Sequence, residues 1–221
     1  ACIVEPIAGS TGILVPPKGY LDRLRKICDK HGILLIFDEV ITGWGRTGSP
    51  FAAQEFNVTP DIMTLAKATT NGVVPMGVVA IRDGIYDAVM DSAPEGAIEL
   101  FHGYTYSGIP AAVAAALAVQ DIFEKENIFA RVKKISPYFQ EALHSLRDLA
   151  CVENIRGYGL LGGIDIKKKD KPGKAGFLVY KACYENGVNF KATGDALVLA
   201  PPFISEKKHI DEIFDKIRKG I

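Results

Sequence analysis

The chain has 221 residues, of which 48% are hydrophobic, so it is long enough to bury a core as one large domain or two smaller ones. Lysine plus arginine equals aspartate plus glutamate at 26 each, which argues against a surface that recruits nucleic acid or an anionic membrane through net charge. Four dispersed cysteines and four dispersed histidines show no metal-ligand spacing, and we expect free thiols in a reducing, cytoplasmic compartment. The longest apolar stretch, 109–119, is too short for a membrane-spanning helix.

The first half of the chain alternates predicted strands and helices. Strands are predicted at 3–4, 33–37, 61–65 and 77–81, and helices at 18–31 and 83–91. The segment 33–37 is apolar at every position, as expected for a parallel strand that is covered on both faces. This alternation predicts an α/β fold with a mostly parallel sheet, whose ligand lies at the carboxyl ends of the strands.

The second half has a different character. After a long loop at 91–108, an alanine-rich helix is predicted at 110–125. Beyond it we expect a helix at 128–149 that is interrupted or restarted near Ser136-Pro137, short strands at 152–155, 160–166, 188–190 and 197–199, and helices at 175–186 and after a Ser205 cap. The sequence therefore predicts a large unit at 1–126 and a small α+β domain at 127–221.

Two side chains at predicted strand ends suggest a common chemistry. Asp38, with Glu39, ends the apolar strand, and Lys67 follows the next one. Pyridoxal phosphate needs an amine to hold its aldehyde as a Schiff base and a carboxylate to keep its pyridine nitrogen protonated. Taken singly, a lysine at a strand end is more often a surface residue, and an aspartate there is more often a cap or an ion-pair partner. The pair therefore needs support from the surrounding motifs.

Three motifs have other interpretations. An apolar strand followed by acidic residues also fits a P-loop ATPase, but the chain has no G-x-x-x-x-G-K-[ST] segment, so this alternative rests on the strand alone. The segment 43–48 matches G-x-G-x-x-G, yet it starts too far from the strand and is followed by Pro50, which favours a loop near the site. The lysine-rich segment 167–171 lacks interleaved aromatic residues and is interpreted as a solvated loop.

Several strings occur in an order that identifies a family resemblance. They are Glu5-Pro6-Ile7-Ala8-Gly9-Ser10, Pro16-Pro17-Lys18-Gly19-Tyr20-Leu21, Phe37-Asp38-Glu39-Val40-Ile41-Thr42-Gly43, Leu65-Ala66-Lys67 and His102-Gly103-Tyr104-Thr105-Tyr106-Ser107-Gly108. The sequence resembles class III pyridoxal-phosphate aminotransferases of fold type I, and most closely the ω-amino acid:pyruvate (β-alanine:pyruvate) aminotransferases. The resemblance implies that 1–126 is the C-terminal part of the large cofactor-binding domain and 127–221 the small C-terminal domain.

The resemblance also implies a role for five residues in pyridoxal phosphate binding. Lys67 corresponds to the Schiff-base lysine and proton carrier, Asp38 to the partner of the pyridinium nitrogen, and Val40 to a residue that packs against the ring. Thr105 corresponds to a threonine that reaches the cofactor phosphate from the neighbouring subunit, which implies a homodimer or a higher homo-oligomer. Glu5 belongs to a Glu-Pro pair near the site, and its structural interpretation is a carboxylate bonded to nearby loops.

Two positions depart from the family pattern. Lys191 stands where ω-amino acid relatives have an arginine that grips the substrate carboxylate, and lysine offers no bidentate fork for that group. Ala68-Thr69 follows Lys67 where many relatives have a glycine and then an aliphatic residue. Lys191 is therefore the expected substrate residue, with carboxylate recognition that differs from that of the relatives.

The function implied by the resemblance is ping-pong transamination of an ω-amino acid or amine with pyruvate or a related oxoacid as acceptor. Two alternatives stay open at this point. An aminomutase or a decarboxylase on the same scaffold would use the same Lys67 and Asp38. The second alternative is an inactive fragment, because the chain begins without methionine inside a predicted strand and the family's phosphate-binding loop is expected upstream of Ala1.

Overall fold

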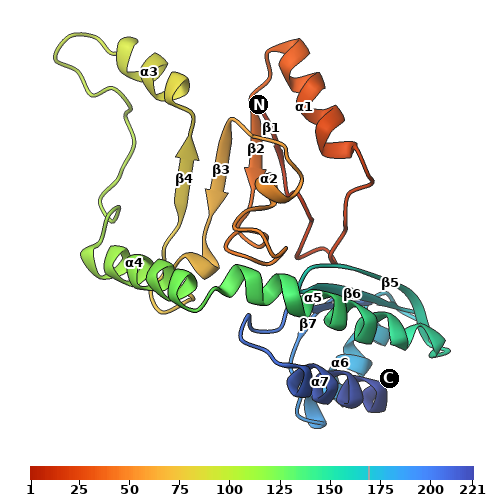
Figure 1. The fold of residues 1–221 in the computed structure, drawn as a ribbon. Coiled ribbons are helices and arrows are strands. Elements are labelled where there is room, and N and C mark those ends of the chain that lie inside the picture. Colours follow the sequence, from red (N-terminus) through yellow and green to blue (C-terminus); the bar gives the residue numbers. More distant parts are fainter. Residues whose placement is uncertain (169) are drawn as a thin grey trace.

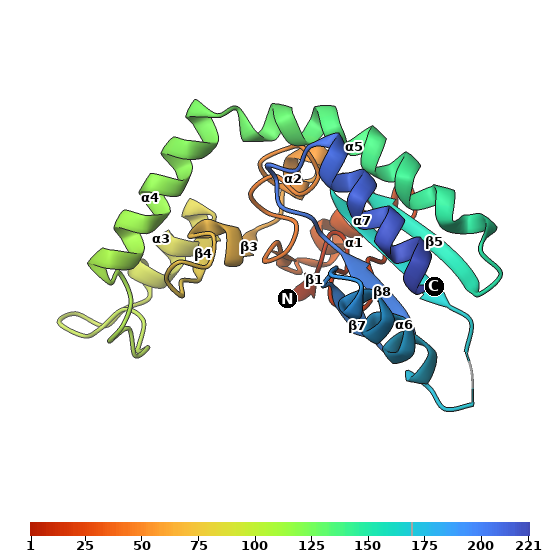
Figure 2. The same cartoon turned by 90° about the horizontal axis from the view of Figure 1, so that it is seen from below.

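The computed structural model describes residues 1–168 and 170–221, and it contains two four-stranded sheets. Helices α4 (Pro110–Lys125) and α5 (Ile128–His144) cross the middle of the molecule, with one sheet on either side of them (Figure 1). The two helices meet at an angle where Asn127, with a φ of 49°, joins them (Figure 2). This arrangement leaves a space between the two sheets, toward which the loops of both halves converge.

The first sheet has the order β1-β2-β3-β4. Its strands are β1 (Cys2–Val4), β2 (Leu35–Asp38), β3 (Ile62–Leu65) and β4 (Val78–Ile81). The first three are parallel, and β4 pairs antiparallel with β3. Helix α3 (Asp83–Asp91) follows β4. The α/β class is therefore confirmed, and the carboxyl ends of β2 and β3 lie side by side.

One face of the first sheet is covered by helices. Helices α1 (Tyr20–His31) and α2 (Ala52–Glu55) pack on it, around Leu35 and Phe37, which are both fully buried. The other face carries Ile3 and Val79, which are 62% and 64% exposed. The expectation that both faces are covered is wrong for the described residues, because no helix among them packs on this second face.

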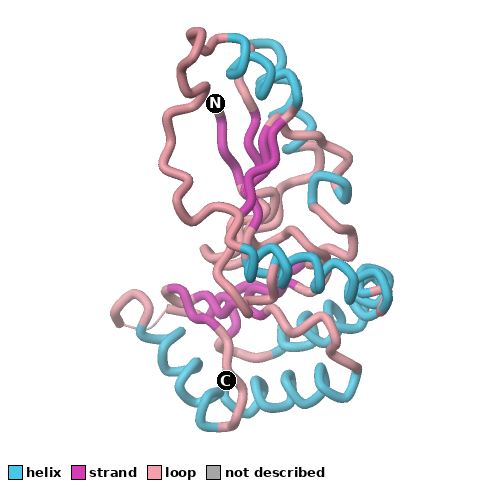
Figure 3. The backbone as a smooth tube through the Cα atoms, turned by 90° about the vertical axis from the view of Figure 1, so that its left-hand side faces the viewer, coloured by secondary structure: helices cyan, strands magenta, loops and turns pink. Residues whose placement is uncertain are grey.

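The second sheet is antiparallel throughout and has the order β5-β6-β8-β7. Its strands are β5 (Val152–Tyr158), β6 (Leu161–Ile166), β7 (Lys191–Thr193) and β8 (Ala196–Leu199). Helices α5, α6 (Lys174–Glu185) and α7 (Lys207–Gly220) build the largest core on one of its sides (Figure 3). On the other side, Leu161 packs against Ile7 and Ile13 from the first half of the chain.

Three local predictions are corrected by the structure. Helix α5 continues through Pro137, and the Ser136 hydroxyl donates to the Val132 carbonyl at 2.6 Å. The last helix is capped by Glu206, whose backbone N–H donates to His209 Nδ1 at 3.0 Å in a reciprocal box, so Ser205 is not the cap. The strand expected at 188–190 lies instead at Lys191–Thr193, where a partner strand is available for hydrogen bonding.

Most of the remaining elements follow the predicted pattern, but α2 was not predicted and β5 extends to Tyr158, beyond the predicted 152–155. Helices α3 and α4 have the predicted bounds, and α5 is followed by a short 3₁₀ turn, η2 (Ser145–Asp148). Lys169, in the lysine-rich segment that was interpreted as a solvated loop, lies outside the described residues. Within the described part of the chain, no helix is long and apolar enough to cross a membrane. The domain boundary at residue 126 stays a prediction.

Candidate active site

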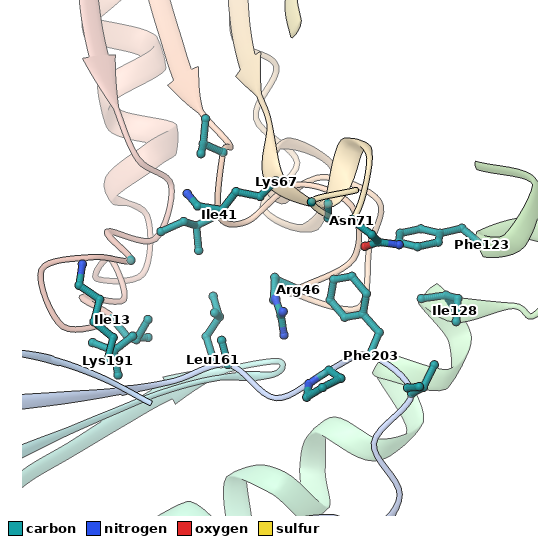
Figure 4. Close-up of a pocket in the computed structure, with 18 of the residues that line it drawn as sticks. Ile13, Ile41, Arg46, Lys67, Asn71, Phe123, Ile128, Leu161, Lys191 and Phe203 are labelled. Atoms are coloured by element: carbon teal, nitrogen blue, oxygen red, sulfur yellow. The ribbon is translucent and has the colours of Figure 1, made fainter. Parts of the chain in front are cut away.

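A cavity of about 760 Å³ lies between the two halves of the chain. Its walls are mainly apolar, with contributions from Ile13, Val40, Phe123, Leu161 and Phe203. The charged and amide side chains on its walls are those of Glu126 and of Arg46, Lys67, Asn71 and Lys191, and Figure 4 labels the last four. Three cations and one carboxylate therefore line an otherwise apolar space, which suits a ligand that carries negative charge.

Lys67 stands at one wall of this cavity. Strand β3 ends at Leu65, and Lys67 begins a 3₁₀ turn, η1 (Lys67–Thr69). Its φ of 48° is unusual for a residue with a side chain, and such strain gathers at functional sites. Among the described residues, no carboxylate lies within 4.0 Å of the Lys67 amine. The amine is therefore available to react with a ligand.

Asp38 is the last residue of β2, and it pairs in register with Thr64 of the neighbouring strand β3. Its Oδ1 atom accepts a hydrogen bond from the Val40 backbone N–H at 3.0 Å. Within the described residues, no hydrogen bond to its second oxygen is found, and the side chain is partly buried. Asp38 does not line the cavity itself, whereas Val40 does. The carboxylate thus keeps an oxygen free for a donor group.

Glu39 has a structural role that sets it apart from Asp38. Its carboxylate is fully buried and accepts hydrogen bonds from the backbone N–H groups of Ala52 and Ala53, at 2.6 and 2.8 Å, and from the Thr42 hydroxyl at 3.0 Å. Burial raises the pKa of this carboxyl, although the three hydrogen bonds act in the opposite direction. Glu39 therefore fixes the start of α2 and the loop that follows β2.

Arg46 is a cavity residue that sequence reasoning missed. Its Nη1 donates to the Pro201 carbonyl at 2.5 Å, and its guanidinium lies 4.3 Å from the centre of the Phe203 ring. Burial lowers the pKa of this guanidinium to about 10. The available signal was an arginine between Gly45 and Gly48, inside a loop that sequence reasoning treated only as a failed nucleotide motif.

Lys191 and Glu5 approach the cavity in different ways. Lys191, the first residue of β7, is exposed and lines the same cavity as Lys67. Glu5 does not line the cavity, but its Oε2 accepts a hydrogen bond at 2.9 Å from the backbone N–H of Gly9, which does. This hydrogen bond is the loop contact that the structural interpretation of Glu5 describes.

Thr105 lies away from the Lys67 cavity. It is exposed and lines a separate cavity of about 510 Å³ with Pro75, Gly77 and Ser107. Lys67 and Thr105 therefore share no cavity within one chain. No group of three or more metal-ligating side chains is found in residues 1–168 and 170–221.

A lysine that follows one parallel strand and an aspartate that ends the neighbouring strand, beside a cavity that the lysine lines, match the amine and the carboxylate that pyridoxal phosphate needs. The chain belongs to the class III aminotransferases, because the model of the family described as "Aminotransferase class-III" matches residues 1–221. The match covers every residue on which the family resemblance was based.

Individual relatives agree with this assignment. The omega-aminotransferase of Caulobacter vibrioides is 52% identical over 220 residues, with 99% of this chain and 50% of the relative covered. The omega-amino acid–pyruvate aminotransferase of Pseudomonas putida is 47% identical over 223 residues, with 98% and 49% covered. An amine transaminase structure from an uncultivated Pseudomonas species, in the PLP-bound form, superimposes with a TM-score of 0.92 at 35% identity, with 100% and 51% covered.

The chain spans about half the length of the curated relatives that it matches. Pyridoxal phosphate is the cofactor that this family uses. The donor set observed here fits that group, because an unpaired amine, an aspartate with a free oxygen and an apolar valine lie at neighbouring strand ends. These residues match the aldehyde, the ring nitrogen and the ring face of the cofactor, respectively.

Proposed function

We propose that the whole protein is a pyridoxal-phosphate-dependent aminotransferase that moves an amino group from an ω-amino acid or an amine to pyruvate or a related oxoacid. The observation that carries this proposal is the position of Lys67 and Asp38 at the carboxyl ends of the adjacent parallel strands β3 and β2. The names of the relatives support the substrate class, since they include omega-amino acid–pyruvate and beta-alanine–pyruvate aminotransferases.

In this proposal Lys67 has two tasks. Its Nζ atom would hold the cofactor covalently through the aldehyde carbon and would be displaced by the amino donor. With the cofactor bound, the free Lys67 amine would act as the proton carrier that accepts the proton from the substrate Cα and passes it on. Lys67 is exposed and lies on the wall of a mainly apolar cavity, so a substrate in that cavity can reach its amine.

Asp38 and Val40 orient the cofactor ring in this proposal. The free oxygen of Asp38 would accept the hydrogen bond from the protonated ring nitrogen, and the Val40 side chain, which lines the cavity, would pack against the ring. When bound, the cofactor supplies an electron sink for the negative charge that develops at the substrate Cα. The backbone N–H of Val40 keeps the Asp38 carboxylate in one orientation by donating to its other oxygen.

The remaining residues act around the substrate and the phosphate. Lys191 contributes a positive charge that recognises a substrate carboxylate at the opposite wall of the cavity. Glu5 holds the Gly9 loop that lines the cavity. Thr105 donates its hydroxyl to the cofactor phosphate of a partner subunit, so that the active unit is at least a homodimer. A cytoplasmic location remains a prediction.

Covalent trapping tests the site. The protein is incubated with pyridoxal phosphate, reduced with sodium borohydride and digested, and the labelled peptide is identified by mass spectrometry. We expect the label on Lys67, no label in Lys67→Ala, and an unchanged label in Lys191→Ala, which removes another cavity lysine. A label on a different lysine, or none in the unmutated protein, would contradict the assignment.

Product analysis tests the reaction class. With β-alanine as donor and pyruvate as acceptor, transamination forms alanine in an amount equal to the donor consumed. Release of carbon dioxide would indicate a decarboxylase, and an isomer of the donor without any need for pyruvate would indicate an aminomutase. Either result would replace the proposed reaction while leaving the roles of Lys67 and Asp38 in place.

A further inference from the structure

The turn that carries Lys67 is held by a side chain from a distant loop. Thr69, the last residue of η1, donates its backbone N–H and its hydroxyl to the Ala66 carbonyl, both at 3.0 Å. The indole Nε1–H of Trp44 donates to the same hydroxyl at 2.9 Å. An indole N–H can only donate and a carbonyl can only accept, so the direction of this chain of bonds is fixed from Trp44 through Thr69 to Ala66.

Trp44 is itself firmly placed. Its backbone N–H donates to the Pro50 carbonyl at 2.6 Å, and its ring packs edge-on against Phe51 and Phe123, with centroids 5.4 and 6.5 Å away. The loop also approaches β3 closely at Gly43, where a Cβ atom would lie 2.9 Å from the Leu65 side chain. Trp44, whose indole donates to Thr69, is therefore held by contacts with Pro50, Phe51 and Phe123.

Lys67 needs such support because its own backbone is strained. Its φ of 48° lies in the left-handed region, which a residue with a Cβ atom enters only when its surroundings hold it there. The bonds from Thr69 hold the Ala66 carbonyl, which belongs to the peptide group before Lys67. The Thr70 N–H donates at 3.3 Å to the Lys67 carbonyl, which belongs to the peptide group after it. Relaxation of this turn would move the amine along the cavity wall.

We propose that Trp44 and Thr69 are positioning residues for Lys67, and that the indole–hydroxyl–carbonyl chain holds the Lys67 amine in its working orientation. This inference rests on the proposed function, and it adds that two residues outside the cofactor contacts set the geometry of the proton carrier. Thr69 is 3% exposed and does not line the cavity, so it acts only through the turn.

The variants distinguish the effect of the Thr69 hydroxyl from the effect of side-chain volume. Thr69→Val keeps the shape and removes the hydroxyl, which leaves the Trp44 N–H without its acceptor, whereas Thr69→Ser keeps the hydroxyl. Trp44→Phe removes the donor and keeps an aromatic ring, and the double variant Trp44→Phe/Thr69→Val removes both partners. Thr70→Val is the matched control, because Thr70 is equally buried and its hydroxyl donates to Val74 at 2.6 Å without contacting Ala66 or Trp44.

The first measurement needs no cofactor. Competitive acylation of the cofactor-free protein compares the labelling of Lys67 with that of Lys191 in the same sample. We expect the labelling rate of Lys67 relative to that of Lys191 to change in Thr69→Val and Trp44→Phe, because a loosened turn alters the position and the surroundings of the Lys67 amine. In Thr69→Ser and Thr70→Val, the relative labelling of Lys67 should equal that in the unmutated protein. In the double variant it should depart from the unmutated value by no more than in either single variant.

The second measurement is the rate of the first half-reaction in the protein loaded with pyridoxal phosphate. Thr69→Val should lower this rate about 10- to 100-fold with KM within about twofold, because misplacement of a reacting group acts on the chemical step. Unchanged acylation and an unchanged rate in a folded Thr69→Val variant would overturn the inference, and so would a Thr70→Val variant with the same losses. Failure of Lys67 to bind cofactor at all would instead overturn the proposed function, and the acylation comparison would still test the positioning.

Discussion

At the scale of single residues, Asp38 and Glu39 are adjacent carboxylates with opposite roles. Glu39 is buried and its oxygens accept three hydrogen bonds from the protein, so its role is to stabilise the fold. Asp38 receives one N–H, from Val40, and keeps an oxygen for a ligand. The alternation of side chains along an extended segment explains the difference, because neighbours point to opposite faces of the sheet.

Asp38→Asn should therefore remove activity without unfolding the protein. The asparagine oxygen can still accept the Val40 N–H, but the side chain loses the charge that keeps the cofactor ring nitrogen protonated. We expect the half-reaction rate to fall by at least about 100-fold, as is typical when an electrostatic partner of the reacting group is removed. Stopped-flow absorbance measures the rate, and a thermal unfolding midpoint equal to that of the unmutated protein confirms an intact fold.

Glu39→Gln should show the reverse pattern. Its new amide group would face donors at Ala52, Ala53 and Thr42, so at least one buried donor would lose its acceptor. The free energy of unfolding should fall by about 1–3 kcal/mol, measured by urea titration. If Asp38→Asn destabilised the protein more than Glu39→Gln did, the roles assigned to the two carboxylates would have to be exchanged.

At the scale of elements, Asp61 connects three parts of the first half of the chain. Its carboxylate is 5% exposed and accepts from Arg25 of α1, from the backbone N–H of Leu35 in β2 and from Arg82 at the start of α3, each at 2.7 Å. Burial alone would raise the pKa of Asp61, but these three donors lower it to about 2. The ionised form is therefore favoured in the folded state.

This network predicts a pH-dependent stability. The pKa of Asp61 is lower in the folded than in the unfolded chain, so its contribution is complete above pH 4 and is lost as the pH falls toward 2. The lowered pKa of Asp61 corresponds to a contribution of about 2 kcal/mol to the free energy of unfolding. Asp61→Asn should be less stable by this amount at pH 7 and should approach the unmutated protein near pH 2, as measured by urea unfolding at both values.

Asp29 supplies the matched control for this prediction. It pairs with the same Arg25 at 2.7 Å, but its side chain is 63% exposed. Asp29→Asn should change the free energy of unfolding by less than about 0.5 kcal/mol, because exposed ion pairs contribute little. Equal losses in the Asp29 and Asp61 variants at pH 7 would show that burial does not decide the strength of this network.

Local sequence signals located most helices, and two of their failures share a cause. Helices α3 and α4 follow from their start signals and periodicity, which are properties of neighbouring residues. The path of α5 through Pro137 and the position of β7 depend instead on what packs or pairs alongside them. Local patterns carry no information about such partners, so these two predictions failed.

At the scale of the whole molecule, the candidate site belongs to both halves of the chain. Lys67 and Val40 come from the first half, and Lys191 and Phe203 reach the same cavity from the second. Thr105 stands outside this cavity in one chain, as a residue that serves a partner subunit would. The proposed site is therefore assembled from segments that are far apart in the sequence.

Mixed subunits test the role of Thr105 across the interface. A hybrid of one Lys67→Ala subunit and one Thr105→Ala subunit keeps a single intact site if Thr105 acts in the partner, because the Thr105→Ala subunit keeps Lys67 and receives Thr105 from the other chain. We expect about half of the unmutated activity in purified hybrids, compared with little in either parent. Hybrids no more active than the parents would place Thr105 in the site of its own subunit.

The sequence by itself determined the α/β class and the family resemblance, and it predicted chemical roles for Asp38 and Lys67. These follow from short strings and strand ends, which need no knowledge of distant contacts. The tertiary structure decided that Lys191 shares a cavity with Lys67, that Arg46 lies in it, and that Trp44 reaches the turn of Lys67. Contacts of this kind join residues that are far apart in the chain, and only packing of the whole fold brings them together.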